Sequence, residues 1–381
     1  MGKLRIVHIV KTFDVGGVES IVKDLSNKLD DIGYQVFILS LEKSDNSMRL
    51  NLNPNVRFVD LGFDNTKNKN PTSFFYVVKK IYNILSEIKP DILNSHLYFI
   101  DLFLVTLALK LIGHNIAHVR TIHSSGGFYE QQKSLANKFR LFLEIISSKI
   151  YMSSYIGVSR KVFENNELFF GKYCHTNKLI YNFIDVAKFS KIKTNISAAN
   201  RSNQFKVVYI ARLELGKNHL LALKVLAELK NRGLDVEFTF AGSGSLKCYL
   251  ESEARLLGVD SYVSFLGNVD NVPNVLKLAD IAIFPSEYEG FSVVLLEKMA
   301  SRLPVICSDI DAFLEVIVNT ENGYIAKHPI EYVEIIERLY FDKDERLRVG
   351  EKAFITAKSF SIDTALIQYN DFYIDCLSVF K

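Results

Sequence analysis

The run Asp280-Ile-Ala-Ile-Phe-Pro285 is followed, after three further residues, by Glu289-Gly-Phe-Ser-Val-Val-Leu-Leu-Glu297. The first run has the apolar composition of a buried strand. Gly290 permits a close approach of the backbone, Ser292 can cap a helix, and residues 293–300 have the composition of a buried helix. The segment therefore predicts a strand, a loop and a helix, the repeating unit of α/β proteins.

Glu289 and Glu297 are the two carboxylates that frame this segment. At helical spacing they are separated by a little over two turns, so they are expected on roughly the same side. Glu289 would face a crevice beside the helix N-terminus, whose free N–H groups favour a phosphate. A sugar nucleotide fits this arrangement, because it carries hydroxyls at both ends of a diphosphate. Two glutamates at this spacing are, on their own, more often part of an ordinary solvated helix.

The surrounding residues, Ser286-Glu-Tyr-Glu-Gly-Phe-Ser292 and Glu297-Lys-Met-Ala300, make the pattern more specific. The segment resembles the donor-binding motif of the retaining family-4 glycosyltransferases, which have the GT-B fold. The resemblance implies that Glu289 orients the hydroxyls of the transferred sugar and that Glu297 holds the ribose. It also implies donor contacts from Gly290, Phe291 and Ser292.

Two cations follow a second predicted strand, in Tyr209-Ile-Ala-Arg-Leu-Glu-Leu-Gly-Lys-Asn-His219. Arg212 offers a bidentate grip and Lys217 a point charge, with Gly216 between them, and such a set suits a diphosphate. Either cation alone could be a surface charge on a strand–helix loop. Together with the glutamate segment they match the family pattern, in which such residues bind the donor diphosphate and stabilise the leaving group.

A pair of glycines lies between the first predicted strand and the first helix. Gly16 and Gly17 allow a tight turn and a close approach of the backbone to a ligand, although many such turns are only structural. The family carries a Gly-Gly-x-Glu loop at this place, near the donor phosphate and the acceptor. Glu19 matches the last position of that loop, or it caps the helix.

His123 ends the predicted strand 117–123, before a glycine-rich loop. A histidine in this place is structural more often than not, but the corresponding histidine of the family touches the transferred sugar. We therefore count His123 among the catalytic candidates, with Glu289, Arg212 and Lys217. The family often has Asp after this histidine, whereas this chain has Ser124, so acceptor-side details carry over poorly. His96, at the end of another predicted strand, is a weaker candidate.

Two further glycine turns complete the expected donor site. Gly242, in Ala241-Gly-Ser-Gly244, could cradle a phosphate or form an ordinary turn after a strand. Leu266 and Gly267 lie in a loop that the resemblance places beside the nucleotide base.

The length of 381 residues exceeds one typical core and suits two domains. Short β-branched runs alternate with helical segments, which favours parallel α/β sheets. We expect a first, acceptor-side domain over residues 1–187, a linker over 188–204, and a nucleotide-sugar-binding domain over 205–360. The resemblance implies a GT-B fold, with two doubly wound Rossmann-like domains and an interdomain cleft. It also implies that the final helix, residues 361–381, crosses back to the first domain.

Charge is distributed unevenly along the chain. Residues 1–190 contain 24 Lys and Arg against 17 Asp and Glu, whereas the remainder is acidic. This is either a plain solvated surface or a surface for anionic lipid head groups or a diphosphate-linked acceptor. No dense basic cluster or nucleic-acid motif is present, so we expect no nucleic-acid partner.

No apolar run is long enough to cross a bilayer, and the first residues lack the apolar core of a signal peptide. The four cysteines are scattered without metal spacing. These features predict a cytoplasmic protein, peripheral on the inner face of the cell membrane if the basic half binds lipid.

Asp309-Ile-Asp311 is the one motif that points to a metal, because a D-x-D pair holds a divalent cation in GT-A enzymes. Its place after a predicted strand favours a loop, so we expect neither a metal nor a cofactor. The combined hypothesis is metal-independent, retaining transfer from a nucleotide-diphosphate sugar, with UDP as a family-level preference. The expected acceptor is a polyprenyl-diphosphate-linked glycan of capsule, O-antigen or other surface-polysaccharide biosynthesis.

Three alternatives remain open at this point. A sugar-nucleotide 2-epimerase has the same fold and needs no second substrate. A non-catalytic glycosyltransferase-like subunit would be expected to have lost the charged residues named above. A Rossmann oxidoreductase is a poorer match, since no G-x-G-x-x-G opens the first domain.

Overall fold

The computed structural model describes residues 3–14, 16–44, 48–63, 71–113, 116–123, 134–190, 204–269 and 271–379, without the side chains of 71–73. The chain divides into two compact units, Met1–Asn182 with Ile362–Lys381, and Phe183–Ser361. Helix α6 (Val186–Ser190) belongs to the second unit and buries Phe189, although the sequence predicts a linker from residue 188. The rest of that predicted linker, residues 191–203, lies outside the described residues.

The first unit contains a seven-stranded sheet in which all neighbouring strands are parallel. The strand order is β3-β2-β1-β4-β5-β6-β7, so it reverses between β1 and β4. The strands are β1 (Arg5–Val10), β2 (Gln35–Glu42), β3 (Arg57–Phe63), β4 (Ile92–Ser95), β5 (Ala117–Ile122), β6 (Ser153–Gly157) and β7 (Cys174–Leu179). The helices are α1 (Gly17–Asp31), α2 (Pro71–Ile88), α3 (Phe99–Ile112), α4 (Leu135–Ile150), α5 (Arg160–Phe170) and α14 (Ile362–Val379).

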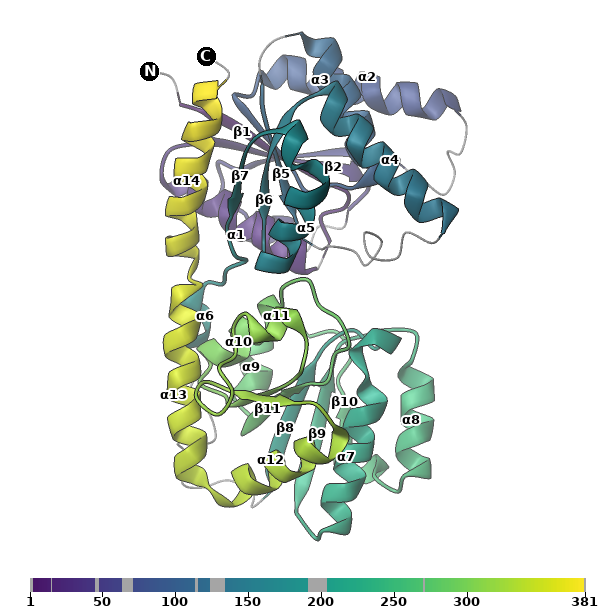
Figure 1. Cartoon of the computed structure of the whole chain (residues 1–381), viewed down its shortest axis with the longest axis vertical. Helices are drawn as coiled ribbons and strands as arrows, with labels where there is room; N and C mark the ends of the chain where they lie inside the picture. The colour runs from purple at the N-terminus through teal and green to yellow at the C-terminus, as the bar shows by residue number, and fades with distance from the viewer. Residues whose placement is uncertain are drawn as a thin grey trace. The chain divides into compact units, whose positions relative to one another are not determined.

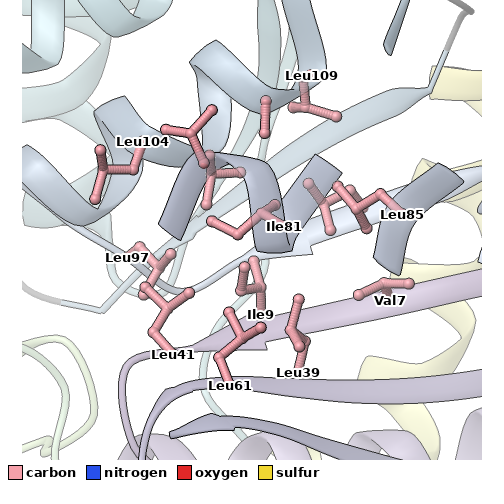
Figure 2. Close-up of a cluster of buried hydrophobic side chains, with 14 of the residues drawn as sticks. Val7, Ile9, Leu39, Leu41, Leu61, Ile81, Leu85, Leu97, Leu104 and Leu109 are labelled. Carbon is pink, nitrogen blue, oxygen red and sulfur yellow. The ribbon is translucent and has the colours of Figure 1, made fainter. Parts of the chain in front are cut away.

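One face of this sheet packs against α2 and α3. Figure 2 shows the cluster, in which side chains from the strands meet those of the two helices. Its labelled members are Val7, Ile9, Leu39, Leu41, Leu61, Ile81, Leu85, Leu97, Leu104 and Leu109. Each buried aliphatic side chain of this kind contributes roughly 1.5–3 kcal/mol before entropy costs. This core holds β1 and β4 in place, and Gly16, Gly17 and His96 follow these strands, whereas His123 follows the neighbouring strand β5.

Helix α14 lies beside α1 and contacts the first sheet (Figure 1). Its buried side chains are Ile362, Ala365, Tyr369, Phe372, Tyr373 and Cys376. Hydrogen bonds join Lys28 to Asp363 over 2.8 Å, Tyr34 to Asn370 over 2.9 Å, and Asn94 to Tyr373 over 2.7 Å. The end of the chain therefore completes the unit in which the chain begins.

The second unit contains a six-stranded parallel sheet of order β10-β9-β8-β11-β12-β13, which reverses between β8 and β11. The strands are β8 (Phe205–Ile210), β9 (Val236–Ala241), β10 (Val263–Phe265), β11 (Ile281–Phe284), β12 (Val305–Ser308) and β13 (Tyr324–Ala326). The helices other than α6 are α7 (His219–Asn231), α8 (Lys247–Leu256), α9 (Val272–Leu276), α10 (Val293–Ala300), α11 (Asp311–Leu314), α12 (Pro329–Phe341) and α13 (Lys343–Ser359). The predicted α/β class with two doubly wound, Rossmann-like domains is confirmed.

Two edge strands differ from the sequence prediction. The pattern predicts a strand over residues 178–182, whereas β7 spans Cys174–Leu179 and is mostly half-buried and polar. Strand β13 is only three residues long and was not predicted. β7 pairs on one side only and lacks the apolar run by which central strands are recognised, whereas β13 is buried but too short to give such a run.

Candidate functional site

Two loops follow neighbouring strands at the centre of the second sheet. β8 and β11 pair with each other, and the strand order reverses between them. The loop after β8 carries Lys217, and the loop after β11 carries Glu289. In doubly wound sheets, ligands bind outside the carboxyl ends of the strands at such a reversal. This position is therefore the candidate binding site of the second unit.

Lys217 and Glu289 form an ion pair across these two loops. Lys217 Nζ lies 2.6 Å from Glu289 Oε1, and the two side chains are 17% and 18% exposed. The hydroxyl of Ser286 donates to the same carboxylate oxygen over 3.3 Å. The hydroxyl of Tyr209 donates to the Lys217 carbonyl over 2.7 Å and lies 3.1 Å from Ser286 Oγ. Charge-assisted hydrogen bonds in a mostly buried setting fix both charged groups in position.

The titratable neighbours of this pair are held neutral. Burial raises the pKa values of the Tyr209 hydroxyl and the Cys307 thiol, and the charge of Glu289 adds to the effect on both. The ring of His219 lies 4.5 Å from that of Tyr209, and its pKa is lowered to about 4 by burial and then by the charge of Lys217. The electrostatics of the site are therefore governed by the ammonium of Lys217 and the carboxylate of Glu289.

Gly216 brings the backbones of the two loops together. The N–H of Glu287 donates to the Gly216 carbonyl over 2.9 Å. A Cβ on Gly216 would lie 2.3 Å from carbons of the Tyr288 ring. A side chain at residue 216 would therefore displace the Tyr288 ring, which is 67% exposed and can move into solvent. Gly290 is half-buried in the second of these loops.

Arg212 makes a different contact. Its Nη1 lies 3.0 Å from Glu214 Oε1, and the two side chains are 73% and 44% exposed. Exposed pairs of this kind contribute little to stability, because water screens them. The structure thus does not bring Arg212 into the Lys217–Glu289 pair, and its guanidinium can change partner at little cost.

The local backbone requires a glycine at residue 242. Its φ is +138°, and a Cβ would lie 2.1 Å from the Ala211 carbonyl oxygen. Its N–H donates to the Gly267 carbonyl over 2.7 Å. The loops after β8, β9 and β10 are therefore in backbone contact, and Leu266 is 48% exposed beside them. The contacts of Gly242, Leu266 and Gly267 with a nucleotide remain predictions.

Helix α10 begins as the sequence predicts. The hydroxyl of Ser292 accepts a hydrogen bond from the N–H of Leu295 over 3.3 Å, so the predicted N-cap is confirmed. Phe291 is buried, with its ring 5.7 Å from that of Phe360, and this contact anchors the loop before the helix. Glu297 is half-buried within the helix, and its contact with a ribose remains a prediction.

In the first unit, Gly16 is the N-cap of α1. A Cβ on Gly16 would lie 2.1 Å from a carboxylate oxygen of Glu19, so this carboxylate folds back over the glycine. Burial, with a smaller contribution from the charge of Asp14, raises the pKa of Glu19. Gly17 has no described atom within 4 Å of a Cβ position, so packing alone does not require a glycine there.

His123 follows β5 and is joined to His96, which follows β4. His96 Nδ1 lies 2.9 Å from His123 Nε2, and His8 Nδ1 lies 3.2 Å from His96 Nε2. The backbone N–H of His123 donates to the hydroxyl of Tyr98 over 2.8 Å. Burial lowers the pKa of His123 to about 4, so its ring is neutral at neutral pH. Residues 124–133, including Ser124, lie outside the described residues.

Asp309 and Asp311 have different surroundings in the described part of the chain. Asp309 is exposed and lies 3.6 Å from Lys327 Nζ, and Asp311 begins the short helix α11. Among the described residues, no group of three or more His, Cys, Asp and Glu side chains could hold a metal ion. Of the described helices, none combines the length and the apolar composition needed to span a membrane.

Two family matches cover most of the chain. Residues 15–188 match Glycosyltransferase Family 4, and residues 191–355 match Glycosyl transferases group 1. The chain belongs to the family-4 glycosyltransferases. The boundary between the two matched segments falls at the end of α6, close in sequence to the division between the two units.

Relatives of this family-4 glycosyltransferase include bacterial enzymes of polysaccharide biosynthesis. The capsular polysaccharide biosynthesis glycosyltransferase CapH of Staphylococcus aureus is 25% identical over 97% of this chain and 99% of its own. The Campylobacter jejuni GalNAc-alpha-(1->4)-GalNAc-alpha-(1->3)-diNAcBac-PP-undecaprenol alpha-1,4-N-acetyl-D-galactosaminyltransferase is 27% identical over 78% and 77% of the two chains. The solved structure of Anabaena HepE in complex with UDP and glucose superposes with a TM-score of 0.80, at 18% identity over 97% and 99%. This likeness shows the GT-B fold.

Only some of the predicted site residues of this family-4 glycosyltransferase contact one another in the structure. Lys217 and Glu289 are in direct contact, whereas Arg212 is not part of that pair. His8 was missed, although a histidine among the apolar residues 6–10 of strand β1 was the available signal. Tyr209 was missed as well, since a tyrosine in a buried strand looks like ordinary core until its hydroxyl partners are known.

Proposed function

We propose that this family-4 glycosyltransferase transfers a sugar from a nucleotide-diphosphate sugar, preferably a UDP-sugar, to an acceptor hydroxyl with retention of configuration and without a metal. The observation that carries the proposal is the mostly buried Lys217–Glu289 pair at the strand-order reversal of the second sheet. At such a place the cation suits the diphosphate of the donor, and the carboxylate suits the hydroxyls of its sugar.

The main energetic cost of this reaction is the negative charge that develops on the leaving diphosphate. Lys217 would exchange Glu289 for a phosphate oxygen, and the N-terminus of α10, from Gly290 to Ser292, would add backbone donors. Glu289, released from the lysine, would accept hydrogen bonds from sugar hydroxyls. Arg212 would leave its exposed contact with Glu214 and add a bidentate contact.

The bond changes balance without a protein nucleophile. The acceptor oxygen forms a bond to the anomeric carbon on the face from which the diphosphate departs, and the bond from that carbon to the phosphate oxygen breaks. The acceptor proton passes to the departing phosphate. The ammonium of Lys217 stabilises the negative charge that this phosphate develops.

For the acceptor we propose a polyprenyl-diphosphate-linked glycan of surface-polysaccharide biosynthesis. The support is the similarity to CapH and to the Campylobacter enzyme, whose name includes PP-undecaprenol. A lipid-linked acceptor also requires access to a membrane surface, for which the first unit offers exposed apolar and basic side chains on α2 and α4.

These side chains form what we call the aromatic–basic surface. Its apolar members are exposed by between 54% and 86%. They are Phe75 and Tyr76 of α2, and Leu135, Phe139 and Phe142 of α4. Exposed cations on the same two helices include Lys79, Lys138, Arg140 and Lys149. Both helices pack on α3 (Figure 1), and aromatic side chains with interleaved cations suit the interface of an anionic bilayer.

Donor binding is tested by thermal shift with a panel of nucleoside diphosphates and their sugars. We expect UDP and a UDP-sugar to raise the melting temperature, and Lys217→Ala to abolish that shift and to lower turnover by about 30- to 1000-fold. Lys224→Ala, which removes an exposed lysine of α7, is the matched control. A normal shift and normal turnover in a Lys217→Ala, Arg212→Ala double variant would refute the proposed diphosphate site.

Two further measurements test the remaining parts of the proposal. The anomeric configuration of the product, read by NMR, decides between retention and inversion. Activity in EDTA decides the metal question, because Lys217, Arg212 and a helix terminus are proposed to replace the cation. Loss of activity in EDTA with recovery in manganese would instead assign a metal role to Asp309 and Asp311.

A further inference from the structure

Three buried histidines form a chain that ends at His123. His8 lies in β1, His96 follows β4 and His123 follows β5, and these strands are neighbours in the first sheet. The ring centroids of successive histidines lie 5.5 and 5.2 Å apart, and each pair is joined through ring nitrogens. The exposed fraction rises from 0% at His8 to 5% at His96 and 9% at His123. The chain therefore has an inner end at His8 and an outer end at His123.

All three rings are neutral at neutral pH. Burial lowers the pKa of His8 to about 3 and that of His123 to about 4. The pKa of His96 is lowered well below its ordinary value, first by burial and then by the two histidines beside it. Each ring thus has one N–H, which can donate, and one bare nitrogen, which can accept.

The middle ring couples the other two. His96 has a single N–H, so it donates to one neighbour and must accept from the other. Only two complete arrangements follow. Either every N–H points toward His123, and the last proton lies on His123 Nδ1, or every N–H points toward His8, and the last proton lies on His8 Nε2.

The inner end decides between these arrangements. His8 Nε2 is buried and has no hydrogen-bond partner among the described residues. A buried N–H without an acceptor is rare, because it loses its hydrogen bond to water without replacement, whereas an unpaired acceptor is tolerated more often. The arrangement that leaves only a lone pair at His8 Nε2 is therefore favoured, and in it His123 bears its proton on Nδ1.

We propose that His8 and His96 are positioning residues that hold His123 as the Nδ1–H tautomer. In that tautomer His123 donates a hydrogen bond through Nδ1 and cannot accept a proton at the same atom, so it acts as a donor and not as a general base. The inference rests on the proposed function in one respect, since the acceptor of that hydrogen bond is taken to be an oxygen of the nucleotide sugar.

Tautomers are measured directly in the full-length protein with ¹⁵N-labelled histidine, from couplings between the ring nitrogens and the carbon-bound ring protons. The chain contains eight histidines, so each signal is assigned by its loss in a single variant. We expect His96 and His123 to be protonated on Nδ1 without any ligand. A proton on Nε2 of His123 in the wild-type protein would overturn the proposal, whatever the activity.

His8→Phe keeps the ring shape and removes the donor. We expect Nε2–H forms to appear at His96 and His123 in this variant, and His8→Asn, which returns an N–H near the position of Nδ1, to reverse the change. His118→Phe is the matched control, because His118 is equally buried in β5 but bonds Ser95 over 2.9 Å and Ser153 over 2.7 Å. Unchanged tautomers in His8→Phe would overturn the proposal. If that variant does not fold, the wild-type spectrum still decides.

Activity separates this inference from the proposed function. With an active UDP-sugar, His8→Phe should lower kcat by about tenfold at nearly constant KM, as expected for loss of the correct tautomer, and His118→Phe should not. An unaltered kcat together with altered tautomers would overturn the donor role. If no nucleotide sugar is used by a wild-type protein with the expected tautomers, the proposed function fails while the positioning by His8 and His96 stands.

Discussion

Lys298 is buried without a hydrogen-bond partner among the residues that the structure describes. It lies in α10, and its side chain is fully buried. The Phe284 ring centroid, 5.4 Å from Nζ, is an apolar neighbour. Burial lowers the pKa of Lys298 to about 7, against the opposing charge of Glu297. Folding therefore works against the charged form of this amine.

We expect Lys298→Met to raise the free energy of unfolding by roughly 1–4 kcal/mol at neutral pH. Since the pKa is lower in the folded state, the unfolded chain binds more protons between about pH 7 and pH 10.5. The contribution of Lys298 to wild-type stability should rise with pH in that window, so the advantage of Met should shrink as pH rises. Urea unfolding at about pH 7 and pH 9.5 measures this, with exposed Lys224→Met as control. A gain that does not change with pH would contradict the prediction.

Sequence reasoning could find Glu289 and Lys217 but not the burial of Lys298. Glu289 and Lys217 each follow a predicted strand of a doubly wound sheet, and such positions converge at one edge. Lys298 lies in a helix that is apolar on most sides, so its inner face cannot be read from the spacing of the apolar residues. Likewise, nothing in the sequence reports the hydrogen bonds among His8, His96 and His123, which depend on the order of β1, β4 and β5.

At the scale of single elements, α4 and α2 carry the aromatic–basic surface. The Phe139 and Phe142 rings are 6.5 Å apart and more than half exposed. We expect Phe139→Ser with Phe142→Ser to weaken binding to phosphatidylglycerol vesicles by at least about tenfold, because two large apolar side chains would no longer enter the interface. Sedimentation with vesicles measures this binding.

The control for this experiment removes equally exposed apolar side chains elsewhere. Leu168 of α5 and Leu256 of α8 are 78% and 77% exposed and lie outside the aromatic–basic surface. The Leu168→Ser, Leu256→Ser variant should bind like the wild-type protein, and binding should weaken with salt and on neutral phosphatidylcholine. Equal losses in the two double variants would show that general surface hydrophobicity, and not this surface, drives the binding.

Strand β5 contributes a second pH-sensitive group, His118. Burial, with a smaller effect from Arg120, lowers its pKa to about 3. At this residue the unfolded chain therefore binds up to one more proton than the folded chain between about pH 3 and pH 6.5, and the contribution of His118 to stability falls as pH falls through this window, by up to about 1.4 kcal/mol per pH unit. Glu19 and Asp101, whose pKa values are raised by burial, act in the opposite direction.

The informative measurement is therefore a difference between variants. Relative to the wild-type protein, His118→Phe should lose about one proton of uptake on unfolding near pH 5, seen as a shallower dependence of the unfolding free energy on pH. Equal slopes for the two proteins between pH 4.5 and pH 6.5 would contradict the neutral state of His118.

At the scale of the whole chain, the last helix is part of the first unit. Residues 362–381 group with residues 1–182, and α14 buries six side chains there. The sequence could suggest this helix, because large apolar residues recur at helical spacing near the C-terminus. Its packing partner was expected from the family resemblance, since spacing shows that a face is buried but not against what.

Deleting residues 361–381 should destabilise the first unit. Each lost large apolar side chain removes roughly 1.5–3 kcal/mol of burial, so the sum approaches the 5–15 kcal/mol by which whole domains are stable. Hydrogen exchange should therefore accelerate in β1, β4 and β5. Protection of β8 and β11, which belong to the other unit, is the internal control. Tyr373→Phe, which removes only the hydroxyl that accepts from Asn94, should have a far smaller effect. Unchanged protection of β1, β4 and β5 in the truncated protein would show that the sheet is stable without α14.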